Sequence, residues 1–305
     1  MIPIITIEGP TASGKSAFSL ELASYFGTQI ISADSRQVYR YMDIGTAKVS
    51  KEAREIIPHH LVDIINPDES FNAGLFAQKA AIAIRSLHES GKIPIICGGT
   101  GLYIRSLLDG LFAIPALPAE LRENLKQQFV ELGRDAMFAK LQQLDADFAA
   151  VISSFDTQRV LRGLEVAIGT GIPLSEHWRR QQKHQEYKVF KILLNPAREI
   201  LYHRINSRLT EMLNEGLIQE INSLLSRGYL STSPGLNSLG YKEFMPYFME
   251  QKPLQDCANM AAQHHRNYAK RQCTWYRKCI FDLTFTNNQI NLSELAVFVN
   301  AKLND

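Results

Sequence analysis

Residues 2–16 read IPIITIEGPTASGKS, and this stretch decides the fold. The apolar run that opens it predicts a buried strand, and a G-x-x-x-x-G-K-S loop follows, ahead of a helical pattern. In such a loop the backbone N–H groups wrap a phosphate, the Lys15 ammonium adds positive charge, and the Ser16 hydroxyl can ligate Mg²⁺. The predicted phosphate-binding residues are Gly9, Pro10, Thr11, Ala12, Ser13, Gly14, Lys15 and Ser16.

Short apolar runs alternate with amphipathic patterns on both sides of this loop. Strands are expected at 2–7, 29–32, 61–65, 93–97 and 187–194, and helices at 15–26, 73–90, 101–108, 201–226 and 255–278. Apolar strands that alternate with helices form a parallel sheet covered on both faces. The predicted fold class is therefore α/β, with a P-loop NTPase-like parallel sheet.

A helical insertion interrupts this alternation. Residues 119–170 show helical periodicity and little strand signal, and Pro115 and Pro118 precede them. We expect two parts: a P-loop-type catalytic core from 1–114 and 188–305, and a helical insertion domain from 115–187.

Composition limits the functional classes. The chain has 305 residues, 45% of them hydrophobic, and a net charge of +2, so nucleic-acid binding requires a local basic patch. No signal peptide or membrane-spanning run is evident. The four cysteines lack the spacing of zinc ligands, which is typical of reduced thiols in a cytoplasmic protein.

Asp34 ends the apolar run at 30–33 and opens the polar cluster Asp34-Ser35-Arg36-Gln37. Three interpretations compete for it: a metal ligand acting through water, a general base on an acceptor, or a cap of the next turn. A second glycine-rich turn, at 98–101, follows a predicted strand and precedes a helix. If both turns lie at the same sheet edge, Thr100 is a candidate diphosphate contact.

Two basic stretches favour an RNA partner. Residues 257–281 contain five lysines and arginines and no carboxylate, with Tyr268, Trp275 and Tyr276 interleaved. The other stretch, Trp178 to Lys183, follows a helix that contains Gln158 to Arg162. Most phosphate loops of this kind bind ATP or GTP, so a P-loop small-molecule kinase is the rival interpretation.

The sequence resembles the tRNA dimethylallyltransferases, also called tRNA isopentenyltransferases, over nearly its whole length. The shared motifs are GPTASGKS at 9–16, SADSRQVYRYMDIGTAK at 32–48, PHHLVDI at 58–64, GGTGLYIRSLLDGL at 98–111, QRVLRGLEV at 158–166, GTGIPLS at 169–175, MLNEGLIQEI at 212–221, LGYKEF at 239–244 and YAKRQCTWYRK at 268–278. The set is highly specific, because the 32–48 motif is not a general NTPase sequence.

The resemblance implies transfer of a dimethylallyl group from its diphosphate to the exocyclic N6 amine of the adenosine 3′ of the tRNA anticodon. Dimethylallyl diphosphate, rather than ATP, would occupy the loop with Mg²⁺, in a protein expected to be a monomer. The implied catalytic residues are Asp34 as general base, Thr100 at the reacting centre and Lys15 at the diphosphate. Positions implied to contact the anticodon stem-loop are Asp34, Ser35, Arg36, Gln37, Thr100, Arg122, Gln158, Arg159, Val160, Leu161 and Arg162.

The chain also departs from the family pattern. Asn237 stands where the family usually has an arginine that is thought to bind diphosphate, and His265 replaces a common threonine. Ser153 to Asp156 replace a His-Pro-Asn-Asp segment, and Glu8 is an unusual neighbour for a diphosphate. A catalytically weakened tRNA-binding paralogue is therefore an alternative to an active enzyme.

Overall fold

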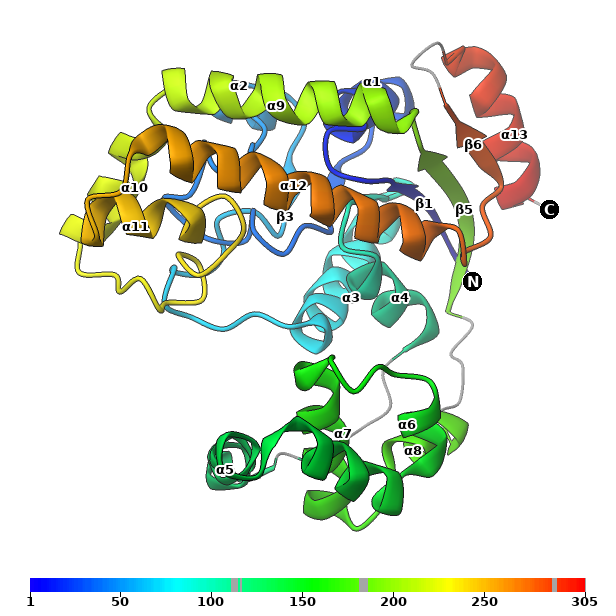
Figure 1. Ribbon diagram of the computed structural model, residues 1–305. Coiled ribbons are helices and arrows are strands. Elements are labelled where there is room, and N and C mark those ends of the chain that lie inside the picture. The colour runs from blue at the N-terminus through cyan, green and yellow to red at the C-terminus, as the bar shows by residue number, and fades with distance from the viewer. Residues whose placement is uncertain (111–114, 116, 181–185, 287–289, 305) are drawn as a thin grey trace. The chain divides into compact units, whose positions relative to one another are not determined.

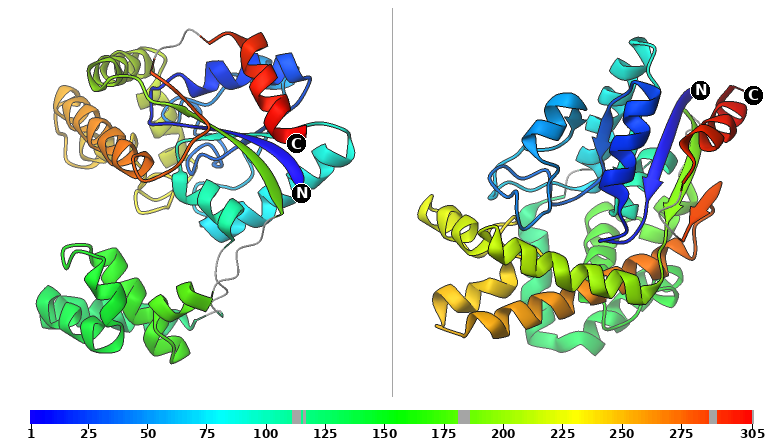
Figure 2. Two further views of the ribbon diagram at one scale, coloured as in Figure 1. Left: turned by 90° about the vertical axis from the view of Figure 1, so that its right-hand side faces the viewer. Right: turned by 90° about the horizontal axis from the view of Figure 1, so that it is seen from above.

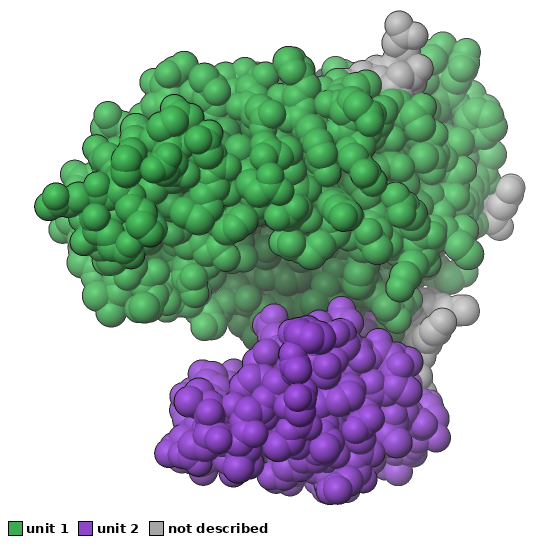
Figure 3. Space-filling view, viewed as in Figure 1, with its two compact units in different colours: residues 1–109, 185–305 green, residues 110–184 purple. Residues whose placement is uncertain are grey.

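The computed structural model describes residues 1–110, 115, 117–180, 186–286 and 290–304 (Figure 1). The chain forms two compact units, residues 1–109 with 185–305, and residues 110–184 (Figure 3). The expected insertion, 115–187, was too long at its end, because Tyr187 is the first residue of a strand of the first unit. The other expected boundary falls on residue 114, outside the described residues.

A parallel sheet forms the first unit. Its strands are β1 Ile2–Glu8, β2 Ile30–Ser32, β3 His59–His60, β4 Ile95–Gly98, β5 Tyr187–Leu194 and β6 Leu283–Phe285. Their order is β3-β2-β4-β1-β5-β6, and every pairing is parallel. Glu8, at the end of β1, is in register with Gly98 of β4 and Leu193 of β5. The carboxyl ends of these strands therefore meet at one edge.

Helices cover both faces of the sheet (Figure 2). Helices α1 Lys15–Phe26 and α13 Leu292–Asn304 pack on one face, and α3 Ala73–Glu89 and α4 Gly101–Asp109 on the other. Successive residues of β1 serve opposite faces, since Ile5 packs in the core with α1 and Ile4 in the core with α3. The predicted fold class is confirmed.

A further helical layer lies beyond the carboxyl edge. It contains α9 Arg198–Asn214, α10 Leu217–Ser226, η1 Lys242–Phe244, α11 Met245–Met249 and α12 Leu254–Tyr276. The single helix predicted at 201–226 was wrong, because Gly216 has φ +104° and separates α9 from α10. Helices α9, α10 and α12 share a core with the segment that follows β2.

The strand predicted at 61–65 was also wrong. The edge strand is β3, two residues earlier, and Leu61 and Asp63 have left-handed φ values of +63° and +57°. An extended strand cannot pass through such residues. Leu61 and Ile65 are nevertheless buried, so the apolar pattern there reflects loop packing.

All the regular secondary structure described in the second unit is helical. Its helices are α5 Ala119–Leu144, α6 Ala146–Ala150, α7 Thr157–Thr170 and α8 Leu174–Arg180. They surround a small core that includes Met137, Leu141, Val160 and Leu164. In the described part of the chain, no helix is long and apolar enough to cross a membrane.

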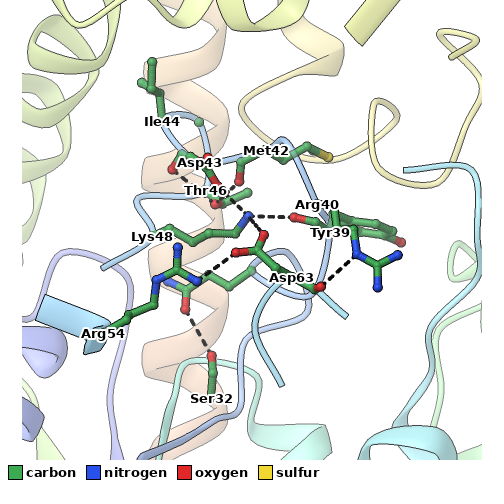
Figure 4. Close-up of polar contacts among 12 residues, drawn as sticks. Ser32, Tyr39, Arg40, Met42, Asp43, Ile44, Thr46, Lys48, Arg54 and Asp63 are labelled. Carbon is green, nitrogen blue, oxygen red and sulfur yellow. Dashed lines mark hydrogen bonds and ion pairs between the residues drawn. The ribbon is translucent and has the colours of Figure 1, made fainter. Parts of the chain in front are cut away.

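Buried charge fixes the segment between β2 and α3, which also includes α2 Lys51–Ile56 (Figure 4). The Lys48 ammonium, 2% exposed, donates to Tyr39 O at 2.6 Å and pairs with Asp43 at 2.7 Å and Asp63 at 2.5 Å. From α10, the Glu220 carboxylate accepts the backbone N–H groups of residues 43, 44 and 45. This segment is therefore held by charge-assisted bonds rather than by regular structure.

We expect Lys48→Met to lower the free energy of unfolding by about 2 to 3 kcal/mol, because it leaves two partly buried carboxylates short of a partner. The neighbouring Lys51→Met, at an exposed position, should change it by less than about 0.5 kcal/mol. Urea denaturation of both variants measures the difference. Equal stability of the two variants would contradict the role given to Lys48.

Candidate active site

The phosphate loop connects β1 to α1, and two of its residues have left-handed backbone conformations. Ala12 has φ +61°, and Gly14, the residue that caps α1, has φ +92°. No side chain caps the first turn of α1, so its N–H groups are available to an anion in front of the loop. The loop thus has the geometry of the predicted phosphate cradle.

Lys15 lies folded over this loop. Its Nζ donates to Pro10 O at 2.7 Å and to Ser13 Oγ at 3.4 Å. Burial lowers the pKa of Lys15 to about 8, although the nearby Asp34 carboxylate acts in the opposite direction. The ammonium is therefore only marginally favoured until an anion joins it.

Asp34 and Thr100 come together at the sheet edge. Asp34 Oδ1 accepts the backbone N–H of Arg36 at 2.8 Å, and Thr100 Oγ1 accepts that of Ser35 at 3.2 Å. Thr100 N also donates to Ala33 O at 3.2 Å, which joins the two turns. Asp34 thus does cap a turn, as one of its interpretations held, and its Oδ2 is not needed for that bond.

Helices α9 and α12 supply site residues that sequence reasoning missed. Gln272 accepts the N–H of Thr11 and donates to Gly99 O, both at 2.8 Å, and so bridges the two glycine-rich turns. Arg208 Nη1 lies 3.5 Å from Thr11 Oγ1, and Arg204 Nη1 lies 3.5 Å from Ala12 O. The i, i+4 spacing of the two arginines places them on one helix face, but nothing in the sequence says what that face meets.

Two adjoining cavities open in front of these groups. The larger, about 620 Å³, is lined by the loop, Ser32, Asp34 and Gln272. The smaller, about 310 Å³, is lined by Arg36, Asn237, Lys242, His265 and Arg271 among others. The residues common to both walls are Thr11, Asp34, Thr46, Arg208 and Tyr268.

The cavity that contains Asn237 is positively charged although Asn237 itself is neutral. It is exposed on the wall of the smaller cavity, which Arg208, Lys242 and Arg271 also line. Arg36 lines the same cavity, so positive charge reaches this region from four other positions.

Residues 37–279 match the family model described as IPP transferase. The chain belongs to this family. Curated relatives support the assignment: a tRNA dimethylallyltransferase from Exiguobacterium sp. is 45% identical over 90% of this chain and 87% of its own. One from Syntrophobacter fumaroxidans is 41% identical over 90% of this chain and 81% of its own.

Solved structures of IPP transferases have the same fold. The full-length tRNA isopentenylpyrophosphate transferase from Bacillus halodurans has a TM-score of 0.73 and 34% identity, covering 100% of this chain and 97% of that one. A eukaryotic dimethylallyltransferase solved while acting on tRNA has a TM-score of 0.82 and 29% identity, covering 97% of this chain and 78% of that one.

The positions predicted to contact tRNA belong to both units of this IPP transferase. In the first unit, Arg36 lines the smaller cavity, whereas Gln37 accepts the Ser32 hydroxyl at 3.0 Å and donates to Ala47 O at 3.3 Å. The amide of Gln37 is therefore engaged within the protein. In the second unit, Gln158 and Arg159 are exposed at the start of α7.

Two of the positions predicted to contact tRNA in the second unit, Val160 and Leu161, have apolar side chains that take part in its core. The Val160 side chain is fully buried in the core of that unit, and Leu161 packs against the same core. A contact through the Val160 side chain is therefore excluded. Lys183, in the predicted basic stretch, lies outside the described residues.

Glu8 is a buried carboxyl at the end of β1. It is 5% exposed and accepts the Thr6 hydroxyl at 3.3 Å. Burial raises the pKa of Glu8 to about 7, although Lys191 and the Thr6 hydroxyl act to lower it. The folded protein holds this proton more tightly than the unfolded chain does. The contribution of Glu8 to the free energy of unfolding is therefore fully present below pH 4.5 and is lost as the pH rises through 7.

We expect Glu8→Gln to remove this pH dependence. Relative to the natural chain, the variant should gain about 2 to 3 kcal/mol of unfolding free energy between pH 5 and pH 8.5, since it has no proton to lose. Urea denaturation of both proteins across this range gives the difference, and effects of other groups cancel. A difference that does not grow with pH would contradict the raised pKa.

Proposed function

We infer that this chain is a tRNA dimethylallyltransferase, which transfers a dimethylallyl group from its diphosphate to an adenosine of tRNA. The observation that carries the inference is the shared wall of the two cavities. Thr11, Asp34, Arg208 and Tyr268 lie between a phosphate cradle and a second cavity lined by cations. A transfer enzyme requires such a junction between donor and acceptor.

The donor half stabilises a departing diphosphate. The phosphate loop, Lys15 and Arg208 line one cavity, and no side chain caps the N–H groups of the first turn of α1. Charge that develops on the leaving oxygen is stabilised best by groups that are already oriented. Donation of two N–H groups makes Arg208 well suited to a phosphate.

The acceptor half requires a base, because an adenine amine is a weak nucleophile whose lone pair is shared with the ring. We propose that the exocyclic N6 amine forms a bond to the allylic carbon while the C–O bond to diphosphate breaks, and diphosphate leaves with the electron pair. The amine proton passes to Asp34, whose turn-capping bond uses only Oδ1. Reaching Asp34 requires the adenine to leave its stack.

Mg²⁺ fits this site as a partner of the diphosphate. It prefers oxygen ligands and commonly binds through one or two protein groups together with substrate phosphates. Ser16 and Asp34 line the same cavity, whereas the described residues hold no cluster of three or more metal-ligating side chains. Bound there, the ion would add positive charge to the leaving diphosphate.

The neighbours of Asn237 favour an active enzyme over a weakened tRNA-binding paralogue. Arg36, Arg208, Lys242 and Arg271 line the same cavity as Asn237, the position where the family usually carries its arginine. A cytoplasmic location is supported by four free cysteines, which suit a reducing compartment. The monomeric state stays a prediction.

We expect Asp34→Asn to lower kcat by about 10²- to 10⁴-fold, because the amide cannot accept the proton. It can still cap the turn, so the KM values for both substrates should change little. Transfer from labelled dimethylallyl diphosphate to unmodified tRNA measures the rate, with the exposed Glu21→Gln as control. The proposed chemistry would be overturned if the natural protein transferred no isoprenoid to tRNA, or if Asp34→Asn transferred it at the rate of the natural protein.

Lys15 should make donor binding pH-dependent. Its pKa of about 8 means that the ammonium is lost above that pH, and diphosphate affinity should then fall by up to about tenfold per pH unit. Titration calorimetry with pyrophosphate from pH 7 to 9.5 tests this, using Lys15→Met as a comparator that lacks the charge. The affinity gap between the two proteins should narrow as the pH rises; a constant gap would refute the prediction.

A further inference from the structure

A buried carboxylate in the second unit holds two arginines that were predicted to contact tRNA. Glu165 Oε1 accepts Arg122 Nε at 3.0 Å and Nη2 at 2.8 Å, and Oε2 accepts Arg162 Nη1 at 2.7 Å. Arg122 comes from α5, and Arg162 lies one turn before Glu165 on α7. The sequence did not reveal this connection, because Arg122 and Glu165 are far apart in the chain.

The carboxylate is inside and the guanidinium groups are outside. The Glu165 side chain is 7% exposed, whereas those of Arg122 and Arg162 are 58% and 43% exposed. On either side of Glu165, Leu164 and Val166 are fully buried in the core. The position of the carboxylate is therefore set by core packing, and it fixes the orientation of both arginines.

The cluster keeps an excess of positive charge. Two guanidinium groups share one carboxylate, and each has further N–H groups that Glu165 does not use. A planar guanidinium held in one orientation presents a fork that matches phosphate oxygens, and it loses little conformational entropy on binding. Loose arginines would have to be ordered at the moment of binding.

We propose that Glu165 is a positioning residue for tRNA binding, which holds Arg122 and Arg162 in the orientation that receives backbone phosphates. The proposal rests on the proposed function, since it takes tRNA as the partner of the second unit. Glu165 itself need not touch the RNA.

If only net charge mattered, removing the Glu165 carboxylate would have the opposite effect on tRNA binding from the one that the proposal predicts. Removing a negative charge near a polyanion should strengthen binding. If Glu165 acts by orienting the arginines, removing its charge should weaken binding although the protein becomes more positive. The sign of the change therefore separates the two explanations.

The test compares Glu165→Gln with Glu123→Gln in the full-length protein. Glu123 is an exposed residue of α5 whose carboxylate pairs with Lys126. We expect Glu165→Gln to raise the KM for tRNA by about 5- to 20-fold, with kcat and the KM for dimethylallyl diphosphate within about twofold of the natural values. Glu123→Gln should leave tRNA binding unchanged or slightly tighter.

The salt dependence of tRNA binding provides a second readout. Loss of oriented arginine–phosphate contacts should reduce the slope of log K against log salt concentration by about 1 to 2 in Glu165→Gln. A merely structural defect would lower the active fraction without changing this slope. If thermal denaturation shows that Glu165→Gln does not fold, Arg122→Lys is tested in its place. This substitution lies at an exposed position, keeps the positive charge and removes the planar guanidinium. It should give the same rise in the KM for tRNA.

The proposal is overturned if Glu165→Gln binds tRNA as tightly as the natural protein or more tightly, or if Arg122→Lys, used in its place, leaves the KM for tRNA unchanged. Failure of the proposed function gives a different result. If the natural protein bound tRNA without modifying it, the proposed catalysis would fail while the salt dependence of binding still tested Glu165; if it did not bind tRNA at all, the variants would have no effect to measure.

Discussion

The strands at the centre of the sheet end so close to their neighbours that no side chain fits between them. A Cβ on Gly9 would lie 2.3 Å from the carbonyl oxygen of Leu194, and one on Gly98 would lie 2.1 Å from that of Ala33. Such contacts are far inside van der Waals separation, so glycine is required at both positions. This close approach brings the phosphate loop, Asp34 and Thr100 to one edge, where parallel strands place their ligands.

The helical layer supplies the site residues that the edge of the sheet does not. The edge supplies backbone N–H groups and one carboxylate, whereas α9 and α12 supply Arg208, Tyr268 and Gln272. Burial has a cost here, since it lowers the pKa of Lys15 and raises the pKa of Tyr268 to about 12. The same exclusion of water strengthens every charge interaction with a bound diphosphate. A site in which burial disfavours the Lys15 ammonium until an anion binds beside it is consistent with an enzyme that binds a diphosphate.

Local sequence signals located the elements that depend on local physics. The loop at 9–16 and α1 were predictable, because glycine spacing and apolar periodicity act over a few residues. The strand at 61–65 failed because buried apolar residues of a loop imitate a strand, and the helix at 201–226 failed because Gly216 reads as a tolerated helical residue. Arg208, Gln272 and Glu165 depend on which faces meet in three dimensions, and a single sequence does not contain that information.

The side chain at position 272 must both accept one hydrogen bond and donate another, and few amino acids can do both at this reach. Its amide accepts from Thr11 N and donates to Gly99 O, and a Cβ on Gly99 would lie 2.6 Å from the amide nitrogen. Asparagine is a methylene shorter, and glutamate would set a second oxygen against the Gly99 carbonyl. Replacing this one side chain would therefore break both hydrogen bonds that link the phosphate loop to the turn at Gly99, although Thr11 and Gln272 lie 261 residues apart in the chain.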